Sequence, residues 1–269
     1  MVAFQARLES SKIAIIGAGH IGTAVVDALY RSDHRHIVAT RTKGSEEKLR
    51  QLEQQYKGVY VTTDNAEAVD NADIIVLAVK PYCIEEAAQQ IKQHSVGKLV
   101  ISVAAAKKLG MIEGILETSR VARVMTGVFV ADEVAAYALG TRGGAEEKEY
   151  DRNAIKYIFG ADARELAEEL LAHRTWVACD TGLLSYEVEL KVQKLKQLGM
   201  NEEAARLFYA ATLEAIGTRL RAGMSGDAIY NLVAGQKSFT AKMRQFLEDN
   251  GCMYIMEQAI EQTVSACNK

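Results

Sequence analysis

A strand, a glycine-rich turn and a helix follow one another without a gap near the start of this chain. The apolar run from Lys12 to Ile16 leads into Gly17-Ala18-Gly19-His20-Ile21-Gly22, and a helical pattern continues from Ile21 to Tyr30. Gly17 permits a tight turn, Gly19 lets a ligand approach the backbone, and Gly22 lets the helix pack closely on the strand. This unit predicts an α/β fold that begins with a parallel strand–helix–strand motif.

Short β-rich runs alternate with amphipathic segments through the first hundred residues. Strands are predicted at residues 12–16, 37–40, 59–62, 74–79 and 99–103, with helices at 21–30 and 46–55. This order predicts a doubly wound parallel sheet. Beyond it, the runs 135–139, 155–159 and 176–179 are interpreted as strands at the far edge of the sheet, with a helix at 163–172 and an exposed loop or hairpin tip at 141–152.

Only helices are expected after Asp180. Asn201 is a good N-cap for one helix, and Ser238 or Gly235 can start another that Gly251 ends. We therefore expect a Rossmann-type domain over residues 1–180 and a smaller all-helical domain over residues 181–269. The helical tail is too small to bury its apolar faces alone, which predicts packing on the sheet domain, on a second subunit as a homodimer or higher homo-oligomer, or on both.

The composition of the 269 residues argues against several classes of protein. Charged residues make up 25% and the formal net charge is -3, so no strong field favours nucleic acid or an anionic membrane. No apolar run approaches the roughly 20 residues of a membrane span, and the first residues lack a signal-peptide core, so a cytoplasmic protein is expected. The four cysteines are expected to be reduced and mainly buried, without metal-ligand spacing, and His34 and His36 to lie in a solvated turn.

The glycine spacing G-x-G-x-x-G, placed between a strand and a helix, predicts a dinucleotide site. The N-terminus of the helix would face the phosphates, so the expected contacts are Gly17, Gly19, His20, Ile21 and Gly22. The alternative interpretation is a tight turn between strand and helix that binds nothing.

The residues after the second strand bear on which dinucleotide is bound. Sites that prefer NAD usually carry Asp or Glu there, about 20 residues after the glycines. This chain instead has Thr40-Arg41-Thr42-Lys43, and two cations with two hydroxyls suit a 2'-phosphate. NADP(H) is therefore predicted over NAD(H), with an ordinary basic turn as the alternative.

Together these features resemble the pyrroline-5-carboxylate reductase family, which reduces a cyclic imine to proline with NAD(P)H. The matching segments are the glycine loop, "VTTDNAEAVDNADIIVLAVKP" over residues 61–81, "VISVAAA" over 100–106 and "RVARVM" over 120–125. The resemblance implies that Asn65 contacts the adenosine ribose and that Ala78, Val79 and Lys80 line the cofactor.

The substrate half of the chain departs from the family pattern at three places. Thr126-Gly127-Val128-Phe129 stands where the family has Pro-Asn-Thr-Pro, and "DTGLLSYEVEL" over residues 180–190 stands for a glycine-rich helix start. Residues 234–240, which include Lys237, Ser238 and Thr240, replace the Ser-Pro-Gly-Gly-Thr-Thr segment that holds the substrate carboxylate. An anion of a different shape is therefore expected to bind there.

The resemblance leaves a set of candidate catalytic and substrate-binding groups. Lys191, Thr240 and Tyr186 are the catalytic candidates, and Lys237, Ser238 and Thr240 the substrate-binding ones, for an imino or keto acid. Glu187 and Lys191 are four residues apart, so a solvated ion pair is the alternative for them. Two other functions stay open: a dehydrogenase of another imino, keto or hydroxy acid, and a cofactor-binding regulatory protein without turnover.

Overall fold

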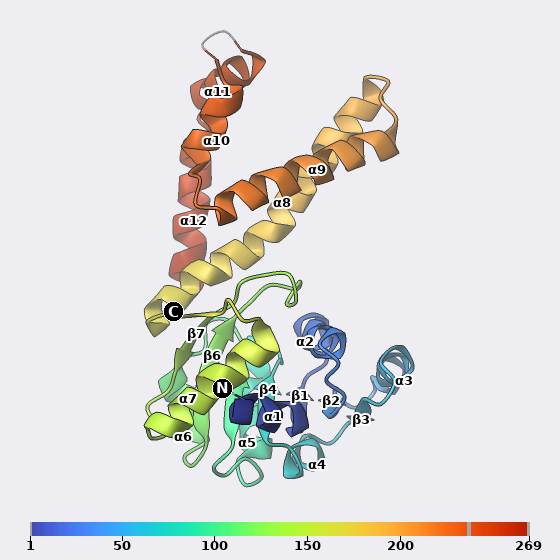
Figure 1. Ribbon diagram of the computed structural model, residues 1–269, viewed down its shortest axis with the longest axis vertical. Coiled ribbons are helices and arrows are strands. Elements are labelled where there is room, and N and C mark those ends of the chain that lie inside the picture. The colour runs from blue at the N-terminus through green and yellow to red at the C-terminus, as the bar shows by residue number, and fades with distance from the viewer. Residues whose placement is uncertain (1, 236–237, 268–269) are drawn as a thin grey trace. The chain divides into compact units, whose positions relative to one another are not determined.

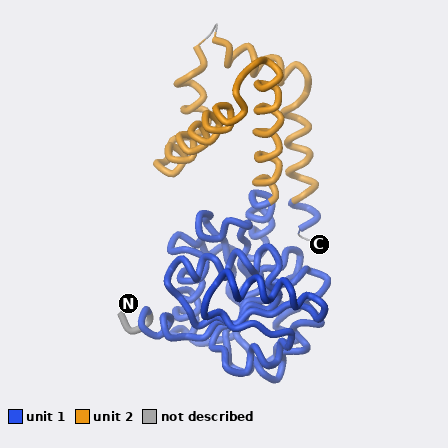
Figure 2. The backbone as a smooth tube through the Cα atoms, turned by 90° about the vertical axis from the view of Figure 1, so that its right-hand side faces the viewer, with its two compact units in different colours: residues 1–178, 264–269 blue, residues 179–263 orange. Residues whose placement is uncertain are grey.

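The computed structural model describes residues 2–235 and 238–267 (Figure 1). The chain forms two compact units, residues 1–178 with 264–269, and residues 179–263 (Figure 2). None of the described helices combines the length and the apolar character that a membrane span requires.

Within the described residues, an eight-stranded sheet forms the centre of the first unit, in the order β3-β2-β1-β4-β5-β6-β7-β8. The first six strands in this order, from β3 through β2, β1, β4 and β5 to β6, are parallel to one another. Strand β7 is antiparallel to β6, and β8 is parallel to β7. The order runs outward in both directions from the β1–β4 pair, which confirms the predicted doubly wound arrangement. The strands are β1 (Ile13–Ile16), β2 (Ile37–Thr40), β3 (Tyr60–Thr62), β4 (Ile74–Leu77), β5 (Leu99–Ser102), β6 (Arg120–Met125), β7 (Ala136–Leu139) and β8 (Arg164–Glu165).

Helices cover both faces of this sheet, because the central strands are apolar on both sides. Ile13 and Ile15 pack into one core and Ala14 and Ile16 into the other, as expected for a buried parallel strand. The first core contains residues of α1 (Val2–Ser10), α2 (His20–Arg31), α3 (Glu46–Gln55) and α7 (Ala145–Phe159). The second contains residues of α4 (Asn65–Asp70), α5 (Ile84–Ile91) and α6 (Leu109–Ile115).

The prediction was wrong between residues 141 and 179. Residues 155–159, predicted as a strand, are the last five residues of helix α7. The loop predicted at 141–152 includes the first half of that helix. Tyr150, Ala154, Ile155 and Ile158 are buried, a spacing of three to four that places them on one helix face. A five-residue apolar run cannot distinguish a strand from a buried helical turn by itself.

The predicted helix at 163–172 and strand at 176–179 are also wrong. Residues 164–165 form β8, which is the edge strand, and Glu168–Leu170 form the short 3₁₀ helix η2. Helix α8 (Leu171–Gln197) follows directly and includes residues 176–179.

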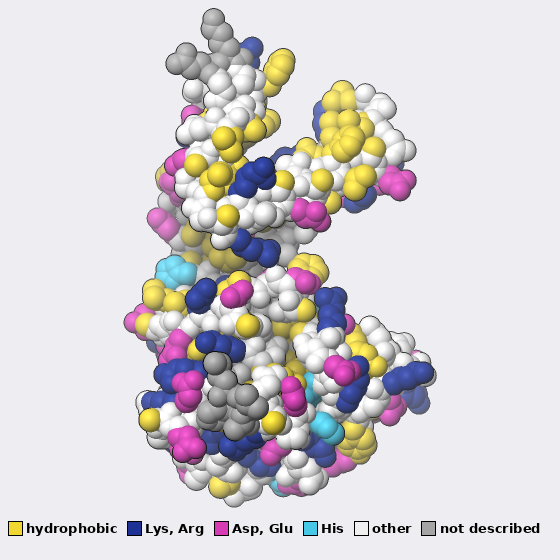
Figure 3. All heavy atoms as spheres, viewed as in Figure 1, with side chains coloured by type: hydrophobic (Ala, Val, Ile, Leu, Met, Phe, Trp, Pro, Cys, Tyr) yellow, Lys and Arg dark blue, Asp and Glu magenta, His cyan; other side chains and the backbone are white. Residues whose placement is uncertain are grey.

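The second unit is helical, as predicted. Its helix starts are capped as expected: the Asn201 side chain accepts a hydrogen bond from Ala204 N at 3.0 Å, and Ser238 Oγ accepts one from Ala241 N at 3.1 Å. Figure 3 shows apolar side chains on the surface of these helices. Its helices are the remainder of α8, then α9 (Glu202–Arg221), α10 (Gly226–Val233), α11 (Phe239–Asp249) and most of α12 (Cys252–Cys267).

Two smaller expectations need correction. His34 is 2% exposed rather than solvated, because α7 covers it and the Tyr157 hydroxyl lies 3.0 Å from its Nδ1. His36 is exposed as predicted. None of the four cysteines, all of which are described, is in a disulfide bond, and none is fully buried: Cys179 is exposed and the others are partly exposed.

The buried imidazole predicts that stability decreases in acid. Burial lowers the pKa of His34 below its ordinary 6.5, so the unfolded chain takes up a proton more readily than the folded protein does. The free energy of unfolding should therefore fall as the pH drops below 6.5, by at most about 1.4 kcal/mol per pH unit for one proton. Urea unfolding between pH 5 and pH 8, which brackets the ordinary histidine range, measures this.

The matched variants are His34→Gln and His36→Gln. The first should flatten the pH dependence, whereas the second removes an exposed ring and should keep most of it. An equal slope in wild type and His34→Gln would contradict the assignment.

Candidate active site

The turn after β1 packs closely against the residues at the end of β4. Gly17 has φ +94°, and a Cβ built on it would lie 2.7 Å from Val79 Cγ1 and 3.1 Å from the Ala78 carbonyl oxygen. A Cβ on Gly22 would lie 2.2 Å from the Gly17 carbonyl oxygen. A side chain on Gly17 would push the turn away from the end of β4, and one on Gly22 would push α2 away from the turn, so both glycines are required by the fold.

Gly19 differs from these two glycines because a Cβ on it would meet no heavy atom within 4 Å. The first amide groups of any helix lack intrahelical partners. Gly19 is the N-cap of α2 and has no side chain, so no cap accepts a hydrogen bond from these amides. An open space in front of free amide donors at a helix N-terminus suits a pyrophosphate. The residues at this turn therefore fit the phosphates of a dinucleotide.

A chain of hydrogen bonds holds this turn from the side of β2. Gly17 N donates to Thr40 Oγ1 at 3.2 Å, and the Thr40 hydroxyl donates to Asn65 Oδ1 at 2.7 Å. The Asn65 amide in turn donates to Gln90 Oε1 at 2.6 Å. Thr40 is 1% exposed, so its role here is to support the glycine turn. Gln90 was not predicted, because it lies on α5, far from the glycine motif in the sequence.

The residues after β2 present positive charge at the same edge of the sheet. The Arg41 guanidinium donates to the Ala18 carbonyl oxygen across the mouth of the turn. Thr42 and Lys43 are exposed. The first acidic residue that follows is Glu46, whose carboxylate accepts from Gly44 N at 2.9 Å, a bond that lowers the pKa of Glu46.

The end of β4 completes this edge. Ala78 N donates to the Ile16 carbonyl oxygen at 2.8 Å, which continues the β1–β4 ladder to the glycine turn. Ala78 and Val79 are partly exposed, and Lys80 is exposed immediately before the short helix η1 (Pro81–Cys83). The structure thus brings the residues predicted for the cofactor to the carboxyl ends of β1, β2 and β4, where ligands bind in doubly wound sheets.

In the turn after β6, Glu133 pairs with Arg174 of α8, a contact that the sequence did not reveal. Gly127 N donates to Glu133 Oε2 at 2.9 Å, and the Arg174 guanidinium donates to the same carboxylate. A Cβ on Gly127 would lie 2.3 Å from each Glu133 oxygen, so glycine makes room for the carboxylate. Within the described chain, the buried Thr126 Oγ1, Glu133 Oε1 and Arg174 Nη1 have no hydrogen-bond partner.

The candidates on α8 lie on an exposed helix surface of the second unit. Tyr186 is 64% exposed. The Lys191 ammonium pairs with the Glu187 carboxylate one turn earlier, which is the ion pair that the spacing offered as the alternative.

The candidates on α11 lie at its first turn. Ser238 Oγ is used as the N-cap, and Thr240 is the second residue of the helix. Lys237 lies outside the described residues. In the described part of the chain, no hydrogen bond or ion pair joins Tyr186 or Lys191 to Ser238 or Thr240.

Comparison with known proteins identifies the family. Residues 12–106 match the family described as NADP oxidoreductase coenzyme F420-dependent. The chain is 30% identical over 254 residues to pyrroline-5-carboxylate reductase of Methanosarcina acetivorans, covering 91% of this chain and 92% of that protein. The chain belongs to the pyrroline-5-carboxylate reductase family. It is therefore an NAD(P)-dependent oxidoreductase of the class that acts on CH–NH bonds.

Other relatives agree in sequence and in fold. Pyrroline-5-carboxylate reductase of Corynebacterium melassecola is 28% identical over 234 residues, covering 80% of this chain and 86% of that protein. The solved structure of Plasmodium falciparum pyrroline carboxylate reductase with NADP bound has a TM-score of 0.80 at 18% identity, covering 97% of this chain and 98% of that one. At this identity the structural match shows the fold of the reductase family.

The two kinds of glycine in the turn predict different effects on the reductase. Gly19→Ala places a methyl group in the open space, so NAD(P)H binding should weaken by about tenfold or more, while the melting temperature should fall only by the small cost of alanine at an N-cap. Gly22→Ala creates a clash with the Gly17 carbonyl and should lower the melting temperature as well. Fluorescence titration with NADPH and thermal unfolding measure the two effects. Equal melting temperatures for the two variants would contradict this assignment.

Proposed function

We propose that this protein is a cytoplasmic NADP(H)-dependent pyrroline-5-carboxylate reductase that reduces the cyclic imine to L-proline. The main observation in support of the proposal is the arrangement of residues at the carboxyl ends of β1, β2 and β4. There an open glycine turn, free amides of α2 and the basic residues after β2 lie together, in a chain of this reductase family.

The preference for NADP(H) is supported by the charge beside the turn. Arg41 lies across the glycine turn and Lys43 is exposed beside it, while the carboxylate of Glu46 is engaged by the Gly44 amide. A 2'-phosphate at this position would gain two cations, whereas a ribose 2'-hydroxyl would lack the carboxylate that usually accepts from it.

The reaction needs a bound hydride donor and a protonated acceptor. Bound NADPH would supply the hydride from its nicotinamide ring. In our proposal, Gly17, Gly19, His20, Ile21 and Gly22 hold the pyrophosphate, and Asn65, Ala78, Val79 and Lys80 line the remainder of the cofactor.

The helical unit would supply the groups that hold the substrate. We assign the substrate carboxylate to the start of α11, where the Ser238 and Thr240 hydroxyls and Lys237 lie close together in the sequence. Thr240, Tyr186 and Lys191 are the candidates for retaining a proton at the imine nitrogen, which makes the ring carbon a better hydride acceptor. Because Lys191 is paired with Glu187, it would have to exchange that partner for the substrate.

A homodimer or larger homo-oligomer is part of the proposal. Among the described residues of the second unit, the buried apolar side chains are only Val192 and Ala205. Large apolar side chains such as Phe208, Phe239 and Phe246 are 58%, 90% and 67% exposed. Helices with so little internal core gain stability by packing on a second subunit.

A related substrate is the second candidate, and the turn after β6 favours it. Thr126 to Phe129 stand where the family pattern has Pro-Asn-Thr-Pro. In the same turn, Glu133 accepts from Gly127 N and pairs with Arg174 of α8, and its carboxylate leaves no room for a side chain on Gly127. A turn of this composition would present different polar groups to the substrate. Another imino or keto acid is therefore the alternative substrate.

Reversal of one exposed charge tests the cofactor preference. Lys43→Glu should weaken NADPH binding by about tenfold and leave NADH binding nearly unchanged, since only NADPH carries the 2'-phosphate. The control is Lys48→Glu, an exposed lysine on α3 that lies beyond the turn. If both variants weaken NADPH binding equally, the weakening comes from the changed net charge of the protein and not from a contact of Lys43 with the 2'-phosphate, and the assignment is wrong.

Turnover tests the activity itself. Purified protein with NADPH and pyrroline-5-carboxylate should oxidise NADPH and form proline, and Thr240→Val should reduce kcat/KM by about tenfold or more through the loss of one substrate hydrogen bond. The control is Thr212→Val on α9, whose hydroxyl donates to the Phe208 carbonyl oxygen of its own helix. NADPH binding without turnover on pyrroline-5-carboxylate, but with turnover on another cyclic imine or 2-keto acid, would establish the alternative substrate instead.

A further inference from the structure

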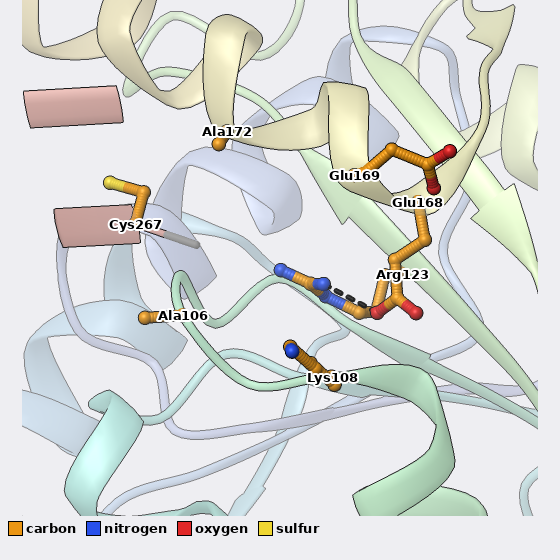
Figure 4. Close-up of a pocket in the computed structure, with 7 residues that line it drawn as sticks. All are labelled: Ala106, Lys108, Arg123, Glu168, Glu169, Ala172 and Cys267. Carbon is orange, nitrogen blue, oxygen red and sulfur yellow. Dashed lines mark hydrogen bonds and ion pairs between the residues drawn. The ribbon is translucent and has the colours of Figure 1, made fainter. Parts of the chain in front are cut away.

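A cavity of about 270 Å³ lies in the first unit, away from the glycine turn. Its volume is just below the range of about 300–1,000 Å³ typical of drug-sized ligands, so it suits a smaller molecule. None of its lining residues belongs to the turns after β1, β2 or β4 that we assign to the cofactor. Figure 4 shows the lining side chains, which are Ala106, Lys108, Arg123, Glu168, Glu169, Ala172 and Cys267.

Arg123 brings a buried guanidinium into this cavity. It lies on β6, is 5% exposed, and donates from Nη1 to Glu168 Oε1 at 2.5 Å. Glu168 Oε1 also accepts from Leu109 N at 2.6 Å, so the carboxylate is fixed between β6 and α6. This arrangement engages one edge of the guanidinium and holds the side chain in place.

The other edge of the same guanidinium is free. Arg123 Nε is buried without a hydrogen-bond partner among the described residues, and no described group bonds to Nη2. Nε–H and Nη2–H point in the same direction and form the fork that matches the two oxygens of a carboxylate. A buried N–H donor without a partner is costly, so a ligand oxygen that reached this edge would relieve that cost.

The charged side chains of the cavity differ in how they lie toward Arg123. Lys108 forms no ion pair with the described residues, and in Figure 4 its ammonium points toward the Arg123 side of the cavity. Glu168 neutralises one of these two cations, and Figure 4 shows the Glu169 carboxylate turned away from the guanidinium. The lining residues thus include two cations and two anions, but one carboxylate is engaged by Arg123 and Leu109 and the other is turned away from the guanidinium, and Ala106 and Ala172 provide an apolar wall.

We propose that this cavity is a second ligand site that binds a small aliphatic carboxylate, with the carboxylate on the free edge of Arg123 and beside the Lys108 ammonium. The short apolar body of the ligand packs against Ala106 and Ala172. Binding requires neither the dinucleotide nor turnover, so the site stands independently of the proposed reaction.

The experiment follows the arginine Nε–H signals of ¹⁵N-labelled full-length protein, without nucleotide, during titration with propionate. Arg123→Lys identifies the signal by its disappearance. A saturable shift of that signal is expected with propionate, and no such shift with sodium chloride at the same ionic strength.

Neighbouring lysines supply the matched variants. Lys108→Met should weaken propionate binding by about tenfold, as expected for the loss of one charged partner. Lys107→Met should leave it unchanged, because the Lys107 ammonium pairs with Glu85 at 3.1 Å and does not line the cavity. Absence of a saturable shift, an equal shift with chloride, or equal weakening by both variants would overturn the proposal.

Discussion

The close contact between the turn after β1 and the end of β4 determines how the rest of the cofactor edge is built. Gly17 and Gly22 leave no room for a side chain, so the backbone of this turn is held against Ala78 and Val79. The β1–β4 pairing, which ends at Ile16 and Leu77, brings the two loops to the same level of the sheet. Gly19 then remains as the glycine of the motif that faces open space.

Most of the sheet could be predicted from the sequence because its signals are local. Strands such as Ile37–Thr40 and helices such as Glu46–Gln55 are complete within a short window, and both were placed at their observed bounds. The failures lie at 141–179, where the buried face of α7 combines Tyr150 and Ala154 with the apolar run that follows. Charged neighbours around Tyr150 conceal that face until the tertiary packing is known.

The same distinction between local and distant contacts applies to the site. The glycine spacing predicts the turn because the whole motif lies between Gly17 and Gly22, although Gly17 packs against Val79 much farther along the chain. Glu133 and Arg174 are 41 residues apart, and nothing in either local segment indicates that they pair. Both side chains are partly buried, so removal of either one would leave the other charge with reduced hydration and no partner ion. The roles of the α8 and α11 candidates depend on substrate contacts, which no spacing reveals.

The first unit is discontinuous in the sequence, and this affects when it can be completed during synthesis. Residues 264–269 belong to the same compact unit as residues 1–178, and Cys267 forms part of its cavity wall. On the ribosome, the sheet can form as soon as β8 has emerged, whereas this wall must wait until all of residues 179–263 have been made. The nascent protein therefore passes through a stage in which the Arg123 guanidinium has its sheet and its Glu168 partner but an open side to the solvent.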